Sequence, residues 1–67
     1  MALTAEQQAV LEVGIERFMR DGETHTEAVK HCLALVDARI NGTNFRDLAV
    51  LNYLFDSSDY LKAMLVA

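Results

Sequence analysis

Residues 24–42 read THTEAVKHCLALVDARING and carry the clearest helical pattern in the chain. Thr24 and Glu27 have the spacing of a capping box, with Thr26 as a competing cap, and Asn41-Gly42 is a strong stop. We therefore predict a helix over about residues 25–40. Its main apolar stripe consists of Val29, Cys32, Leu33, Val36 and Ile40. The far side carries His31 with the apolar residues Ala28, Ala34, Leu35 and Ala38. Because small side chains let another helix approach closely, we place this helix in the middle of the fold.

A similar signal precedes this segment. Thr4 and Gln7 repeat the capping-box spacing, and Asp21-Gly22 provides a left-handed stop, which predicts a helix over about residues 4–20. One face of that helix is apolar and contains Leu3, Val10, Leu11, Gly14, Ile15 and Phe18.

The C-terminal segment is ambiguous because it carries two apolar stripes. Asn44 or Thr43 is placed to cap a helix that begins at Phe45, with a first stripe of Phe45, Leu48, Leu51 and Phe55 and a second of Val50, Leu54, Leu61 and Leu65. Between them, Asp56-Ser57-Ser58-Asp59 contains only poor helix formers. Either one long helix is apolar on two sides, or the helix breaks. We lean towards a break or kink near Asp56–Ser58, giving helices over about residues 44–55 and 58–66.

Composition and length support a single all-α domain over residues 1–67, a small bundle of three helices with the short fourth one as an option. The chain is 52% hydrophobic and 24% charged, which excludes disorder, and its single Cys32 excludes an internal disulfide scaffold. No apolar run is long enough for a membrane span. The N-terminus lacks the pattern of a signal peptide, so we expect a cytoplasmic protein. The net charge of −4 disfavours binding to phosphate backbones or anionic lipid.

Neither a metal site nor an active site is indicated. His25, His31 and Cys32 are the available nitrogen and sulfur ligands, but their spacing does not bring them to one helix face. We expect an exposed His31 and a packed, inert Cys32. Phosphate loops, nucleophile elbows and dinucleotide fingerprints are absent from the sequence. We therefore expect no catalytic residues, cofactor or metal, and rank a small catalytic or metal-binding domain third among the functions.

A helix-turn-helix DNA-binding regulator is the second function to consider. Ala38 and Gly42 have the spacing of that motif's small residue and turn glycine, and Leu48 and Leu51 fall at its later apolar positions. However, Asp37, Asn41 and Thr43 occupy positions that should be apolar. The would-be recognition helix has Arg46 as its only base, whereas phosphate contacts normally come from several.

The function that the sequence favours is protein–protein interaction. Tyr side chains are enriched in interfaces, and so short a chain gains burial by association. The predicted partner or dimer interface contains Tyr53, Tyr60, Met64, Leu35, Ala34 and Ala38. The apolar run Met64–Ala67 points the same way. We expect an acidic helical homodimer or a subunit of a small assembly, acting as an adaptor, co-chaperone or inhibitor of a larger complex, of a type common in phage and mobile elements.

Overall fold

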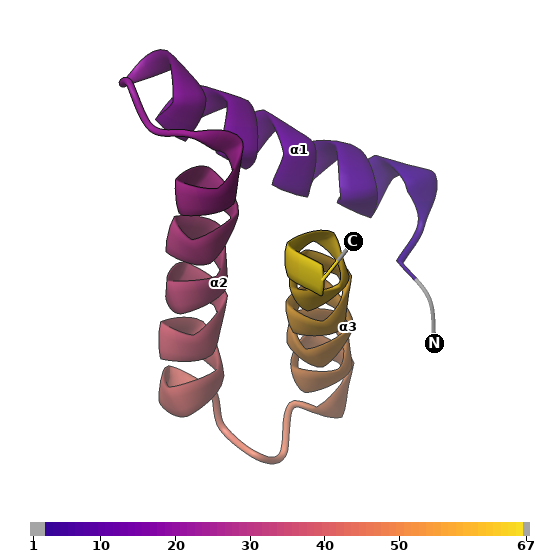
Figure 1. The fold of residues 1–67 in the computed structure, drawn as a ribbon. Coiled ribbons are helices and arrows are strands. Elements are labelled where there is room, and N and C mark those ends of the chain that lie inside the picture. Colours follow the sequence, from indigo (N-terminus) through magenta and orange to yellow (C-terminus); the bar gives the residue numbers. More distant parts are fainter. Residues whose placement is uncertain (1–2, 67) are drawn as a thin grey trace.

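The computed structural model describes residues 3–66, which form three helices: α1 (Ala5–Arg20), α2 (His25–Gly42) and α3 (Leu48–Val66). The helices α2 and α3 lie side by side as an antiparallel hairpin, and α1 crosses the end of that hairpin where α2 begins and α3 ends (Figure 1). The predicted all-α bundle is therefore confirmed. The central position of α2 is confirmed too, because α2 packs against both other helices. Met1 and Ala2, and Ala67 at the end of the apolar C-terminal run, lie outside the described residues.

Both predicted capping boxes are present. In α1 the Gln7 amide donates to Thr4 Oγ1 at 3.2 Å, and the Thr4 amide donates to Gln7 Oε1 at 2.9 Å. In α2 the corresponding distances between Thr24 and Glu27 are 3.2 and 3.0 Å. Gly22 follows α1 with φ of 103°, a left-handed conformation that favours glycine, as the sequence indicated.

The core is small and is built mainly from α2 and α3. Its buried apolar residues are Ile15, Ala28, Val29, Cys32, Val36, Leu51, Leu54 and Leu61. The predicted main stripe of α2 is confirmed, since Leu33 and Ile40 also pack against this cluster. Ala28 is a correction, because it is fully buried rather than on the far side of α2. It lies one turn into α2, where α1 crosses, and belongs to the same cluster as Ile15 of α1.

The predicted break in the C-terminal helix is wrong, because α3 runs without interruption through Asp56–Asp59. Ser57 and Ser58 are buried at the packed side of α3, and Ser57 Oγ donates to the Tyr53 carbonyl at 2.8 Å. The serine hydroxyl is thereby satisfied within the helix instead of capping a new one. Their small size suits a helix that lies close to its neighbours.

The start and the buried face of α3 also differ from the prediction. The helix begins at Leu48 rather than near Phe45, and the Asp47 carboxylate accepts from the Val50 amide at 3.4 Å, as a capping residue does. The second predicted stripe is buried or half-buried, whereas in the first stripe only Leu51 is buried. Phe45, Leu48 and Phe55 are exposed, because a continuous helix can turn only one of the two stripes towards α2.

None of the helices within residues 3–66 combines the length and the apolarity that a membrane span requires.

Candidate partner-binding groove

An apolar hollow of about 380 Å³ lies where the three helices meet. It is lined by residues of all three helices, and α1 and α3 are the pair of helices with the fewest close contacts. The hollow is lined by Val10, Leu11, Gly14, Phe18, Cys32, Leu35, Val36, Arg39, Tyr53, Leu54 and Ser57. Most of these side chains are hydrocarbon, and the Ser57 hydroxyl already donates to a carbonyl within α3.

Two large aliphatic side chains stand at the hollow without cover. Val10 of α1 is 64% exposed and Leu35 of α2 is 51% exposed, so most of the apolar surface of both residues contacts water. Val10 was predicted to belong to the buried face of α1, and this is a correction. It lies towards the edge of that face and lines the hollow, where most of its surface remains exposed.

A second hollow of about 600 Å³ adjoins the first and is lined by Gly14, Arg17, Phe18, Arg20, Asp21 and Leu35. Gly14, Phe18 and Leu35 line both hollows, which makes them parts of one continuous surface. We call the residues that line the two hollows the groove face.

The charged residues of the groove face are mostly basic. They are Arg17, Arg20, Arg39 and the single acid Asp21. Within residues 3–66, none of the three guanidinium groups forms an ion pair. The three arginines are half of the six basic side chains in the chain, while Asp21 is one of ten acids. The groove face is therefore a basic region on an acidic protein.

Of the six residues that the sequence predicted for an interface, two line the groove face and four do not. Leu35 and Tyr53 both line the groove, one from α2 and the other from α3. Ala34 and Ala38 are exposed on α2 but do not line the groove. Tyr60 and Met64 are half-buried and lie on the opposite side of α1 from Val10.

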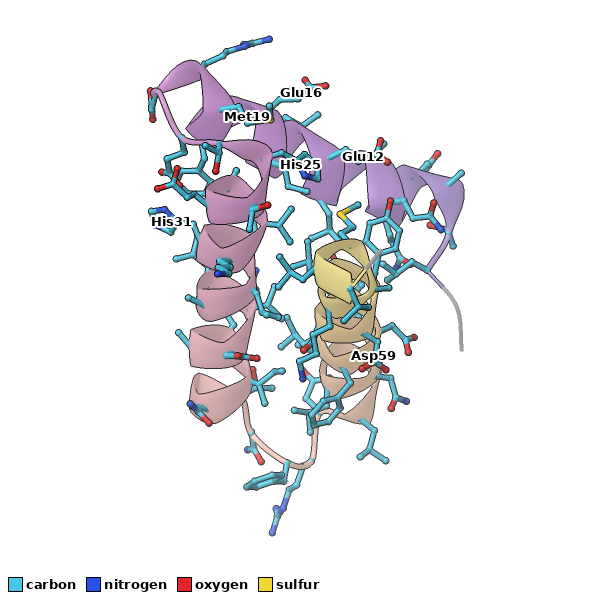
Figure 2. The ribbon with its side chains drawn as sticks, viewed as in Figure 1. Glu12, Glu16, Met19, His25, His31 and Asp59 are labelled. Atoms are coloured by element: carbon cyan, nitrogen blue, oxygen red, sulfur yellow. The ribbon has the colours of Figure 1, made fainter. Side chains whose placement is uncertain are left out.

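That opposite flank of α1 is acidic. A hollow of about 380 Å³ there is lined by Glu12, Ile15, Glu16, Met19, His25 and Met64. Figure 2 shows Glu12, Glu16 and Met19 along α1, with His25 near them at the start of α2. The Tyr60 hydroxyl donates to Glu12 Oε1 at 3.0 Å, and burial together with this bond raises the pKa of Tyr60. Within the described residues, no group of three or more His, Cys, Asp or Glu side chains is placed to hold a metal ion.

His31 and Cys32, the remaining candidates for a metal site or an active site, both pack against neighbouring side chains. His31 is exposed, as predicted, on the side of α2 away from α3 (Figure 2). Its ring stacks on Phe18 with centroids 3.9 Å apart, and its Nδ1 lies 3.2 Å from Glu23 Oε2. Cys32 is buried in the core, as predicted, and burial together with the nearby Glu23 raises the pKa of its thiol. A raised pKa disfavours the reactive thiolate.

Sequence reasoning missed most of the groove face. Arg39 lines the first hollow from α2 and Arg17 lines the second from α1, and nothing in their spacing along the chain shows that these helices bring them to adjoining hollows. Gly14 was noted as a glycine on an apolar helix face, and this was the one available signal. The crossing angle of α1, which opens the groove, is not encoded in any local pattern.

Comparison with known protein families, curated proteins and solved structures finds no match for this chain. The case for a function therefore rests on the groove face itself.

Proposed function

We propose that this protein is a protein–protein interaction module that binds its partner through the groove face. The observation that carries the proposal is the apolar hollow between the three helices with Val10 and Leu35 uncovered beside it. Contiguous apolar surface of this kind, bordered by polar residues, is typical of interaction sites.

The total surface area supports the same proposal. The accessible surface is 4833 Å² for a chain of 7.5 kDa. A compact folded monomer of this mass is expected to expose about 4,200 Å². The chain thus exposes about 600 Å² more than a compact monomer of its mass. Association would thus provide the burial that so short a chain lacks.

Two kinds of partner fit this proposal. A homodimer needs no other component, and symmetric dimers are the commonest oligomers. Binding to a different protein would make the chain an adaptor, co-chaperone or inhibitor within a larger complex. Both forms require the groove face to be covered in the working state of the protein.

Site-specific photo-crosslinking in the source organism tests the proposal. A photoreactive phenylalanine analogue replaces Leu35 in one variant and the exposed Asn41, which does not line the groove, in a control variant. We expect crosslinked products from position 35 and few from position 41. A product of twice the 7.5-kDa monomer mass identifies the homodimer, and other masses identify a different partner. Equal crosslinking from both positions, or none from position 35, would contradict the proposal.

DNA binding through the α2–α3 hairpin gains no support from the described residues. Gly42, the expected turn glycine, is the last residue of α2, and the positive φ among the described glycines belongs to Gly22. The loop before α3 carries Arg46 next to Asp47, which offers little to a phosphate backbone. Sequence-specific binding in a gel shift at low salt would reverse this ranking.

A further inference from the structure

We infer that the natural occupant of the groove face is an acidic amphipathic helix of another protein, rather than a second copy of this chain. The inference rests on the proposed function and names the chemistry of the partner. Its first support is the shape of the site. An amphipathic helix binds by placing apolar residues at positions i, i+3, i+4 and i+7 into an apolar hollow, and the groove supplies such a hollow between three helices.

The second support is charge complementarity. Arg39 lines the apolar hollow from α2, whereas Arg17 and Arg20 of α1 line the adjoining second hollow together with the single acid Asp21. Because none of the three arginines is paired within the described residues, each is available to a carboxylate of the partner. Carboxylates beside the apolar stripe of a bound helix would meet guanidinium groups from both α1 and α2.

The same charges disfavour two copies that meet groove to groove. In a two-fold symmetric contact, each copy presents the same surface to the other. Two faces that each carry three arginines and one acid would then meet, and bringing two surfaces of the same net charge together is unfavourable. A second copy could still offer its acidic α1 flank with Glu12 and Glu16, and this arrangement is one outcome of the test.

Gly14 gives independent support because it belongs to the wall of both hollows. A Cβ atom at this position would have Cys32 Sγ 3.6 Å away as its nearest neighbour, which is an ordinary contact. Packing within this chain therefore does not demand a glycine. A residue without a side chain does leave the wall of the groove clear for an occupant.

The test uses three fluorescent helical peptides of about 16 residues with the same leucine positions. Their remaining surface positions carry Glu in the first peptide, Gln in the second and Lys in the third. Fluorescence anisotropy at low salt measures the binding of each peptide to the full chain. An exposed or half-exposed charge pair contributes a factor of roughly two to five in affinity, so we expect the Glu peptide to bind about tenfold more tightly than the Gln peptide. The Lys peptide should bind most weakly, and added salt should reduce the differences.

Matched variants locate the preference on the groove face. The double variant Arg17→Gln/Arg39→Gln should lose most of the preference for the Glu peptide. The control Lys30→Gln/Arg46→Gln changes the net charge equally away from the groove and should keep the preference. Leu35→Glu should weaken binding of all three peptides, and Gly14→Ala should weaken it by several-fold. Circular dichroism checks that each variant is folded.

Each other outcome has a defined meaning. Equal binding of the three peptides, or strongest binding of the Lys peptide, overturns the acidic partner and leaves the groove as the binding site. If no peptide binds and crosslinking from position 35 captures a second copy, the occupant is this chain itself, so the inference fails while the proposed function stands. If a random-sequence DNA duplex displaces the Glu peptide, the arginines bind the phosphate backbone of DNA and the inference is wrong. If neither peptide binding nor crosslinking occurs, both proposals fail.

Discussion

Gly14 lowers the stability of the fold and, by our inference, favours the binding of a partner. A glycine inside a helix costs about 0.5–1 kcal/mol relative to alanine, and space exists here for a methyl group. We therefore predict that Gly14→Ala raises the free energy of unfolding by about 0.5–1 kcal/mol, as measured by urea denaturation.

The matched control is Gly22→Ala. That position also has open space, but its φ of 103° strains any other L-residue, so the change should lower the free energy of unfolding by about 1 kcal/mol. Destabilisation by Gly14→Ala would show that packing within the chain needs the glycine, and Gly14 would then give no support to a bound partner.

The capping box of α2 makes one contribution to stability dependent on pH. Hydrogen bonds from the backbone and side chain of Thr24 lower the pKa of Glu27 from its ordinary value of 4.5, with a smaller contribution from Lys30. Because the pKa is lower in the folded state, this contribution is present above the ordinary value and is lost as the pH falls through the folded value.

We predict that Glu27→Gln removes this pH dependence while it keeps the box, because Gln7 occupies the same position in α1. Thermal unfolding of both proteins at about pH 7 and about pH 3 gives the measurement. The advantage of the wild type over Glu27→Gln should be larger at the higher pH. A difference that does not change with pH would show that the Glu27 carboxylate contributes nothing through its charge.

Individual residues with local roles were the most predictable part of the molecule. Both capping boxes and the left-handed Gly22 follow from side chains within four residues of one another, and the sequence contains that information. Phe45 and Phe55 were placed on a core-facing stripe by their spacing, and both are exposed. Their burial depended on which stripe of α3 faces α2, which is a tertiary property.

At the scale of elements, the continuity of α3 depends on the four residues Asp56–Asp59. Replacing a helix-capping serine by alanine lowers the free energy of unfolding by about 0.5–2 kcal/mol. The same replacement inside a helix raises the free energy of unfolding by a few tenths of a kcal/mol. We predict that Ser57→Ala leaves the free energy of unfolding unchanged or raises it by up to about 0.5 kcal/mol. A loss of about 1 kcal/mol or more would show that the helix breaks there, as the sequence alone suggested.

The existence and order of the helices were predictable because each long segment has a clear start, stop or apolar period. The sequence predicted a break near Asp56–Asp59, where α3 is in fact continuous, because the local propensity opposes a helix there. Burial of Leu54 and Leu61 on either side of this segment favours one continuous helix, and this tertiary contribution outweighs the propensity of four residues.

At the scale of the whole molecule, the decisive feature is the way α1 crosses the α2–α3 hairpin (Figure 1), because the apolar hollow lies where the three helices meet. The sequence predicted surplus apolar surface and an interaction function, and it correctly placed Leu35 outside the core. It could not assemble Val10, Leu35 and Tyr53 into one hollow, because they come from three helices whose relative angles are set by packing. The basic character of the groove face also depends on these angles, because its arginines come from two different helices.

The central claim is that the groove face is covered when the protein works, and cysteine accessibility tests it most directly. Leu35→Cys and the control Asn41→Cys are each treated with a maleimide, as purified protein and in cells of the source organism. Wild-type protein provides the blank, because Cys32 is buried and its raised pKa slows the reaction. We predict that both positions react in dilute purified protein, whereas in cells position 35 is protected and position 41 is not. Equal reactivity of the two positions in cells would contradict the account.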